Sequence, residues 1–170
     1  NKLNSDWDHV ATNKDNAVKL ILNNMKITDS GYNNGPWNRY DLNFACPVEL
    51  NNVTSTKALA FKSDATLNNV TITEDGDNYA IWIQANGQNV VINGLTVNSA
   101  GRGIKIADEY VDNAKRVILN VANANFTTAN KAAVLVSSTA GANITASNVD
   151  ITNVEEDSVN FVWVDEDWGA

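Results

Sequence analysis

The sequence has 170 residues, a length suited to one domain, and a formal net charge of −8 at pH 7. This acidic balance argues against a nucleic-acid partner, because binding to phosphate requires a concentration of lysine and arginine. The sequence has no run of about 18 apolar residues that would span a membrane, and its single Cys46 cannot form an internal disulfide.

Residues 1–15 have no regular apolar pattern, and we expect them to form a cap or a partial first coil. Terminal repeats differ from internal ones, so we expect Trp7, and Trp168 in the tail at 165–170, to cover the ends of the core. His9 is the only histidine, and we assign it no role as a base or metal ligand. Because the sequence starts without methionine, we also expect it to be part of a larger protein.

A repeated motif organises residues 16–164. Leu-Asn-Asn-Val-Thr occurs at 50–54 and again at 67–71, and degenerate copies recur with steps of 28, 17, 25, 29 and 25 residues. Each step fits one coil of a solenoid, so the sequence predicts a single repeat domain over 1–170. The second asparagine of the motif serves as a marker, and the six markers are Asn24, Asn52, Asn69, Gly94, Asn123 and Asn148.

The register around each marker is that of β-strands. Apolar residues stand two positions before the marker and mostly at one and three positions after it, with polar residues between the last two. The marker is therefore flanked by inward residues at unequal distances, and the chain must turn there. Asparagine and glycine adopt left-handed backbone angles at low cost. We therefore interpret the six markers as a structural corner ladder, in which stacked amides hydrogen-bond to one another.

A further short strand is expected between successive corners, and one more after the last corner. The candidates are 42–44, 59–61, 81–83, 104–106, 134–136 and 162–164, and each has apolar residues at its two ends. The sequence thus predicts about six coils with three short strands each. The central residue of each candidate points outward, and this outward column contains Trp82, Lys105, Leu135 and Trp163.

Three segments carry a family resemblance: Gly103-Ile104-Lys105-Ile106, the stretch Gln88 to Leu95, and the stretch Leu67 to Thr73. They resemble the coils of right-handed parallel β-helices of the pectin lyase-like superfamily, over about residues 16–164. The resemblance implies an all-β, single-stranded, right-handed parallel β-helix. With its acidic, asparagine-rich composition, the chain is most similar to the non-catalytic bacterial surface or adhesin-like members, which implies an extracellular or cell-surface location.

The outward column contains no aspartate or glutamate. Lyases and glycosidases need carboxylates clustered on one face, for calcium or for acid–base chemistry. We therefore predict no catalytic, cofactor or metal residue, and no cofactor. The acidic stretch Glu74 to Asp77 lacks the residue order of a calcium loop, so we interpret it as a solvated turn. A polysaccharide lyase or glycoside hydrolase, active or degenerate, stays the alternative on fold analogy.

Aromatic residues give the positive signal for function. Trp82, Lys105 and Trp163 are expected on one outer face, with the long connection 29–41 and the segment 108–116 as walls. Aromatic rings stack on sugar rings while polar groups bind the hydroxyls, so the expected ligand is an oligo- or polysaccharide, such as a host surface glycan. The wall residues in this prediction are Trp37, Arg39, Tyr40 and Tyr110. The other interpretation is that a long loop packs over Trp82.

A stripe of threonines gives a third interpretation. Thr54 and Thr56, then Thr71 and Thr73, are expected side by side on a flat outer face, as in ice-binding proteins. Lys26, Asn125 and Asp150 interrupt the stripe, and threonine is in any case a common solvent-facing strand residue. We therefore favour a non-enzymatic extracellular or cell-surface module that is adhesin-like or binds glycans.

Overall fold

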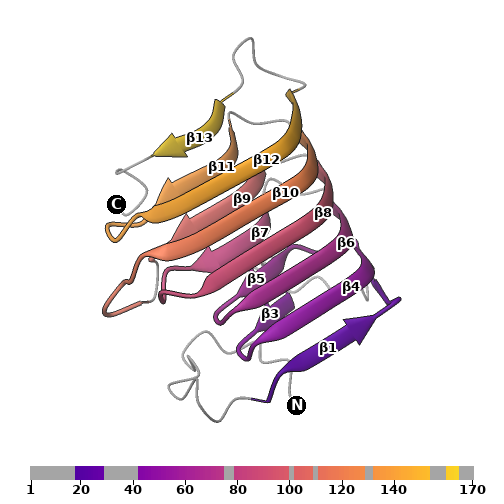
Figure 1. The fold of residues 1–170 in the computed structure, drawn as a ribbon, viewed down its shortest axis with the longest axis horizontal. Coiled ribbons are helices and arrows are strands. Elements are labelled where there is room, and N and C mark those ends of the chain that lie inside the picture. The colour runs from indigo at the N-terminus through magenta and orange to yellow at the C-terminus, as the bar shows by residue number, and fades with distance from the viewer. Residues whose placement is uncertain are drawn as a thin grey trace, which may run out of the picture.

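The computed structural model describes residues 18–28, 42–74, 79–99, 102–108, 111–128, 132–153 and 160–164. The expected caps at 1–15 and 165–170 lie outside these ranges. Every regular element within them is a β-strand, and all paired strands run parallel, as a β-solenoid requires (Figure 1). The all-β parallel fold predicted from the sequence is confirmed.

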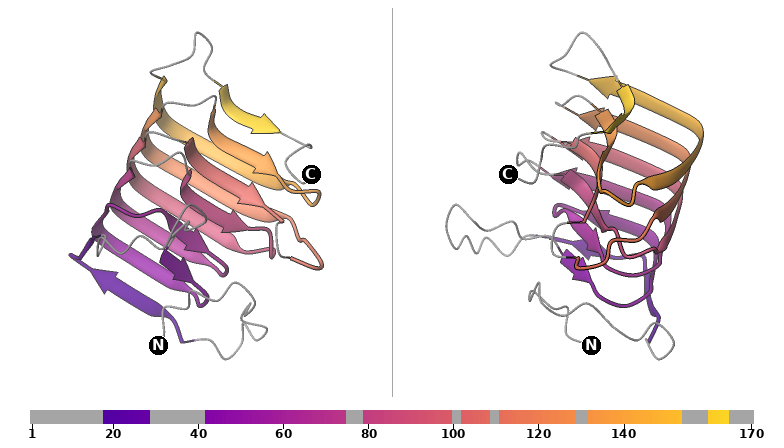
Figure 2. Two further views of the ribbon diagram at one scale, coloured as in Figure 1. Left: turned by 180° about the vertical axis from the view of Figure 1, so that it is seen from behind. Right: turned by 90° about the vertical axis from the view of Figure 1, so that its left-hand side faces the viewer.

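Two parallel sheets form the walls of the solenoid (Figures 1 and 2). The long sheet contains β1 (Leu20–Asn23), β2 (Lys26–Ile27), β4 (Val48–Ser55), β6 (Ala65–Glu74), β8 (Asn89–Ser99), β10 (Val117–Thr128) and β12 (Ala142–Asn153). The short sheet contains β3 (Leu42–Phe44), β5 (Leu59–Phe61), β7 (Tyr79–Gln84), β9 (Arg102–Ala107), β11 (Ala132–Ser137) and β13 (Asn160–Val164).

Each coil consists of one long strand followed by one short strand. The coils from β4 to β11 have neighbours on both sides, whereas β1 to β3 and β12 to β13 form the end levels. The solenoid therefore has about four complete turns, and the predicted number of about six counted the end levels as full coils. The predicted second and third strands of each coil are continuous in the long sheet from β4 onward, where one strand bends at the marker.

The bend has the same backbone geometry at every level. The φ angles are 54° at Asn24, 54° at Asn52, 53° at Asn69, 83° at Gly94, 54° at Asn123 and 51° at Asn148. These values lie in the left-handed region, which asparagine and glycine enter more readily than other residues. A single left-handed residue therefore turns the chain from one wall of the solenoid to the next without interrupting the strand pairing on either side.

Side-chain amides link the corners into ladders. The Nδ2 of Asn52 donates to Oδ1 of Asn24 at 3.1 Å, and Nδ2 of Asn69 donates to Oδ1 of Asn52 at 3.3 Å. A second ladder runs beside the first, where Asn68 donates to Asn51 and Asn51 donates to Asn23, both at 2.8 Å. In each of these bonds the later coil donates to the earlier one.

Gly94 interrupts the corner ladder, because it has no side chain. A Cβ atom at Gly94 would lie 2.5 Å from Oδ1 of Asn69, so the corner leaves little room for a side chain. The next corner residue, Asn123, bonds instead to Oδ1 of Asn93 at 2.8 Å, and Asn148 then bonds to Asn123 at 2.7 Å. The ladder thus shifts by one residue at this level and continues.

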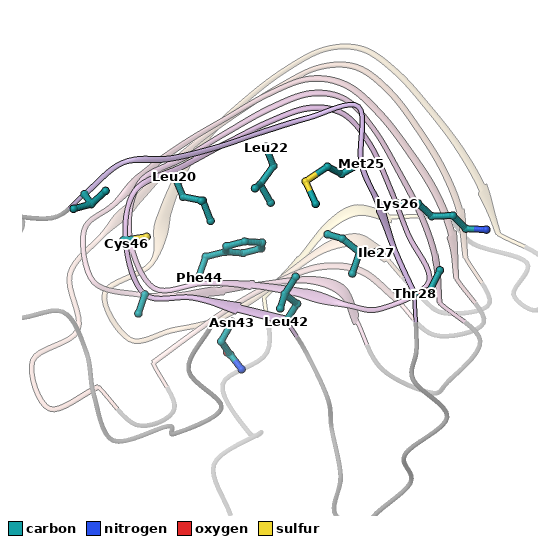
Figure 3. Close-up of a pocket in the computed structure, with 12 residues that line it drawn as sticks. Leu20, Leu22, Met25, Lys26, Ile27, Thr28, Leu42, Asn43, Phe44 and Cys46 are labelled. Atoms are coloured by element: carbon teal, nitrogen blue, oxygen red, sulfur yellow. The ribbon is translucent and has the colours of Figure 1, made fainter. Parts of the chain in front are cut away.

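Inward side chains form continuous apolar columns. Leu50, Leu67 and Ile92 are stacked in register and almost fully buried. In the short sheet the rings of Phe44 and Phe61 stack with their centroids 5.5 Å apart. Figure 3 shows the first coil from the end, with Phe44 directed into the interior. Each fully buried leucine or isoleucine contributes roughly 1.5–3 kcal/mol to stability, so the columns supply most of the driving force for folding.

The register predicts the effect of a charge in the core. Leu67→Asp should prevent cooperative folding, because an unpaired buried carboxylate costs several kcal/mol. Thr73→Asp is the matched control, since Thr73 is exposed on the same strand, and it should change the free energy of unfolding by less than about 0.5 kcal/mol. Urea denaturation measures both. Similar stability for the two variants would show that Leu67 does not face the core.

The corner predicts a difference between two substitutions of one residue. Asn52→Gly removes the ladder amide but keeps easy access to the left-handed angle, so it should cost about 1 kcal/mol. Asn52→Ala removes the amide and also places a methyl group in that conformation, so it should cost about 1–2 kcal/mol more. Chemical denaturation gives both values. If the glycine variant were as unstable as the alanine variant, the backbone angle would not be a source of the cost.

Candidate functional site

Four residues of the predicted outer column, from Trp82 to Trp163, lie in one register on the short sheet. Trp82 pairs with Lys105, Lys105 with Leu135, and Leu135 with Trp163. Three strand spacings of roughly 4.8 Å place the two tryptophans about 14 Å apart along the solenoid axis. The structure therefore brings Trp82, Lys105 and Trp163 onto the same face.

The other predicted site residues lie outside the described part of the chain. These are Trp37, Arg39 and Tyr40 of the first expected wall and Tyr110 of the second. Their place at a ligand groove stays a prediction.

The outer column is buried near its middle. Trp82 is 5% exposed and Lys105 is 1% exposed, whereas Trp163 is half-buried. Trp82 forms a small apolar cluster with Ala60 and Ala107, separate from the main core. Trp82 therefore does not lie open on the sheet, because its ring packs against Ala60 and Ala107. Strand alternation places a side chain outside a sheet but does not determine what covers it.

Lys105 lies between two aromatic rings. Its Nζ is 5.3 Å from the centroid of the Tyr79 ring and 5.4 Å from that of Trp82. The negative faces of the two rings offset part of the cost of removing the ammonium group from water. The contact of Tyr79 with Lys105 was not predicted, because strict alternation along the strand would place Tyr79 on the inner side, with Ile81. Instead Ala80, next to Ile81, belongs to the main core, so the alternation breaks at the start of β7.

Gln84 places an unsatisfied amide on the same outer face. Its side chain is 1% exposed, and neither Oε1 nor Nε2 has a hydrogen-bond partner among the residues that the structure describes. In the neighbouring strand β9, Ala107 is the pairing partner of Gln84. On the other side, in β5, Phe61 pairs with Ile83, and Lys62 is the next residue after Phe61. Lys62 is itself 4% exposed. A buried amide without partners is costly, and such groups usually indicate a bound molecule or water.

Gln88 provides a contrast within the same turn. Its Nε2 donates to the backbone oxygens of Phe61, at 3.2 Å, and Gln84, and its Oε1 accepts from the Asn86 amide at 2.8 Å. This side chain is fully buried and fully bonded, so it fixes the turn after β7 to the preceding coil. No signal in the sequence distinguished Gln84 from Gln88, since both are polar residues beside a turn.

Among the described carboxylates, Asp108 lies nearest along the chain to a strand of the short sheet, because it directly follows β9. It accepts hydrogen bonds from the Thr139 amide at 2.9 Å and the Thr139 hydroxyl at 2.8 Å. Burial alone would raise the pKa of Asp108, but these hydrogen bonds hold that pKa below its ordinary value. Asp108 is thus an ionised structural group that ties the end of β9 to the turn before β12. No group of three or more metal-ligating side chains occurs in the described ranges.

The burial of Trp82 makes its replacement a test of packing. Trp82→Ala should lower the free energy of unfolding by about 3–5 kcal/mol, because it leaves a large cavity between Ala60 and Ala107. Trp163→Ala is the control at the half-buried end of the same column, and it should cost clearly less. Thermal and chemical denaturation measure both losses. A Trp82→Ala variant within about 1 kcal/mol of the wild type would contradict the packed arrangement.

Comparisons with protein-family models, curated proteins and solved structures find no match to this chain. Within the described ranges there is also no helix long and apolar enough to span a membrane. The outer face of the short sheet is therefore interpreted from its own residues.

Proposed function

We propose that this chain is a non-enzymatic, adhesin-like module of an extracellular or cell-surface protein that binds acidic glycans. The binding patch consists of Lys62, Tyr79, Trp82, Gln84 and Lys105 on the outer face of the short sheet. One observation carries the proposal, namely the buried Gln84 amide, which has no hydrogen-bond partner within the described part of the chain. Its donor and acceptor match the hydroxyl groups of a sugar, which both accept and donate hydrogen bonds.

The charge of the patch favours an acidic sugar over a neutral one. The chain has a net charge of −8, yet the patch contains two lysines, Lys62 and Lys105. An amide beside ammonium groups suits the carboxylate of a uronic acid, because hydrogen bonds between charged groups are stronger than those between neutral groups. The overall negative charge repels an acidic polymer at long range, so the interaction depends on these short-range contacts.

The five patch residues are buried, and the half-buried Trp163 lies two coils beyond Lys105 in the same column. Trp82 packs against Ala60 and Ala107, and the Nζ of Lys105 lies over its ring, so Trp82 helps to position this lysine. Trp163 is half-buried and presents the better stacking surface in the same column. The proposed ligand therefore runs along the solenoid axis from Gln84 toward Trp163. We also propose that the chain is related to the pectin lyase-like superfamily and, within it, to the bacterial surface proteins.

Two glutamine substitutions separate binding from folding. Gln84→Met replaces an unsatisfied amide by an apolar group of similar size, so stability should stay unchanged or increase. Binding of oligogalacturonate should weaken by about tenfold, as expected for the loss of hydrogen bonds to a charged ligand. Gln88→Met is the control, because it removes a fully bonded amide, and it should cost about 1–3 kcal/mol of stability. Calorimetric titration and chemical denaturation give the two readouts.

Three results would contradict the proposal. The first is that Gln84→Met loses as much stability as Gln88→Met, which would give the Gln84 amide a structural role. The second is that neutral oligosaccharides bind as well as acidic ones. The third is that incubation with polygalacturonate releases reducing ends or unsaturated products, which would favour a lyase or hydrolase.

A further inference from the structure

The two ends of the solenoid leave core columns partly uncovered. Met25 is 44% exposed, whereas Val53, one coil later in the same column, is fully buried. At the opposite end Val164 is 67% exposed, although its column begins with the buried Phe44. A cavity of about 650 Å³ opens at the first coil, and Figure 3 shows apolar side chains directed into it. Exposed apolar groups of this kind indicate an interaction surface.

The asparagine ladders give the two ends complementary hydrogen-bonding groups. Every ladder bond runs from Nδ2 of a later coil to Oδ1 of an earlier one, as from Asn52 to Asn24 and from Asn148 to Asn123. At the first level Nδ2 of Asn24 has no ladder residue before it in the described chain. At the last level Oδ1 of Asn148 has none after it. One end therefore offers a donor at the corner, and the other end offers an acceptor.

The charges at the two ends are complementary in the same way. One outward column of the long sheet starts with Lys26, continues through Thr54, Thr71, Thr96 and Asn125, and ends with Asp150. Lys26 and Asp150 are both exposed, and within the described ranges neither forms a salt bridge. The column thus begins with a cation on the edge formed by β1 and β2 and ends with an anion on the edge strand β12.

We propose that the last level of one molecule docks on the first level of a second copy of this chain, head to tail. Strand β12 then pairs in parallel with β1 and β2 of the next molecule, as β10 pairs with β12. Continuing the register places Asp150, Asn148 and Val164 of one molecule beside Lys26, Asn24 and Phe44 of the next. The contact buries the exposed Met25 and Val164, and the charge pair fixes the register.

This contact joins two different surfaces, so it leaves one free end of each kind. Such heterologous contacts produce open rods rather than closed dimers, unless the rotation closes a ring. Each added molecule extends the outer face of the short sheet along the axis. The assembly requires only the end levels and does not depend on glycan binding.

Charge reversal tests the contact on the full chain. Wild-type protein should show an average mass that rises with concentration in sedimentation equilibrium. Lys26→Asp and Asp150→Lys each place like charges at the contact, so each variant alone should associate at least about tenfold more weakly.

An equimolar mixture of the two variants should regain association. In the proposed register, every contact between unlike molecules joins opposite charges. The Lys26→Asp variant still has Asp150, and the Asp150→Lys variant still has Lys26. In one such contact these two unchanged residues face each other. The other contact pairs the two substituted positions, where the same charges are exchanged. Restored association therefore reports that these two positions face each other.

Asp112→Lys is the control for net charge, since Asp112 is exposed in a turn between β9 and β10 and away from both ends. It should associate like the wild type. Melting temperatures should match the wild type for all three variants, because the altered residues are exposed. The proposal is overturned if the wild type stays monomeric up to about 1 mM. It is also overturned if the single variants associate normally, or if their mixture stays dissociated.

Discussion

The in-register stacking of parallel coils is the constraint on which the rest of the structure depends. Inward side chains are buried only if each one lies on its counterpart in the next coil, and a slip of one residue would turn the whole set outward. The left-handed corner at each marker fixes this register. It determines which residue is the last to point inward on one wall and which is the first to point inward on the next. The amide ladders add hydrogen bonds at the same positions.

Keeping the corner constant leaves the rest of each coil free to vary. The markers are between 17 and 29 residues apart, yet the strands of every coil pair in one continuous register. The additional residues lie in connections between strands and leave the columns unchanged. Variation in chain length therefore falls between the strands and not within them. The scaffold and the surface that it presents can change independently of each other.

The sequence predicted what depends on local pattern. Period-2 alternation around the markers predicted the inward columns and the left-handed corners, and the column from Trp82 to Trp163 followed from the same register. It did not predict the burial of Trp82, since burial depends on contacts from distant parts of the chain. It also missed Tyr79, where alternation breaks. The difference between Gln84 and Gln88 depends on which backbone atoms lie within reach of each amide, and only the folded coil determines that.

The uniform direction of the asparagine ladders has an electrical consequence. A side-chain amide resembles a peptide unit, whose dipole is about 3.5 D, and here all ladder amides point their oxygens toward later coils. Their dipoles therefore add along the axis, as peptide dipoles do in an α-helix. The first level, with Lys26, becomes the positive pole, and the last level, with Asp150, becomes the negative pole. The ladders thus give the solenoid an axis with two electrically different ends.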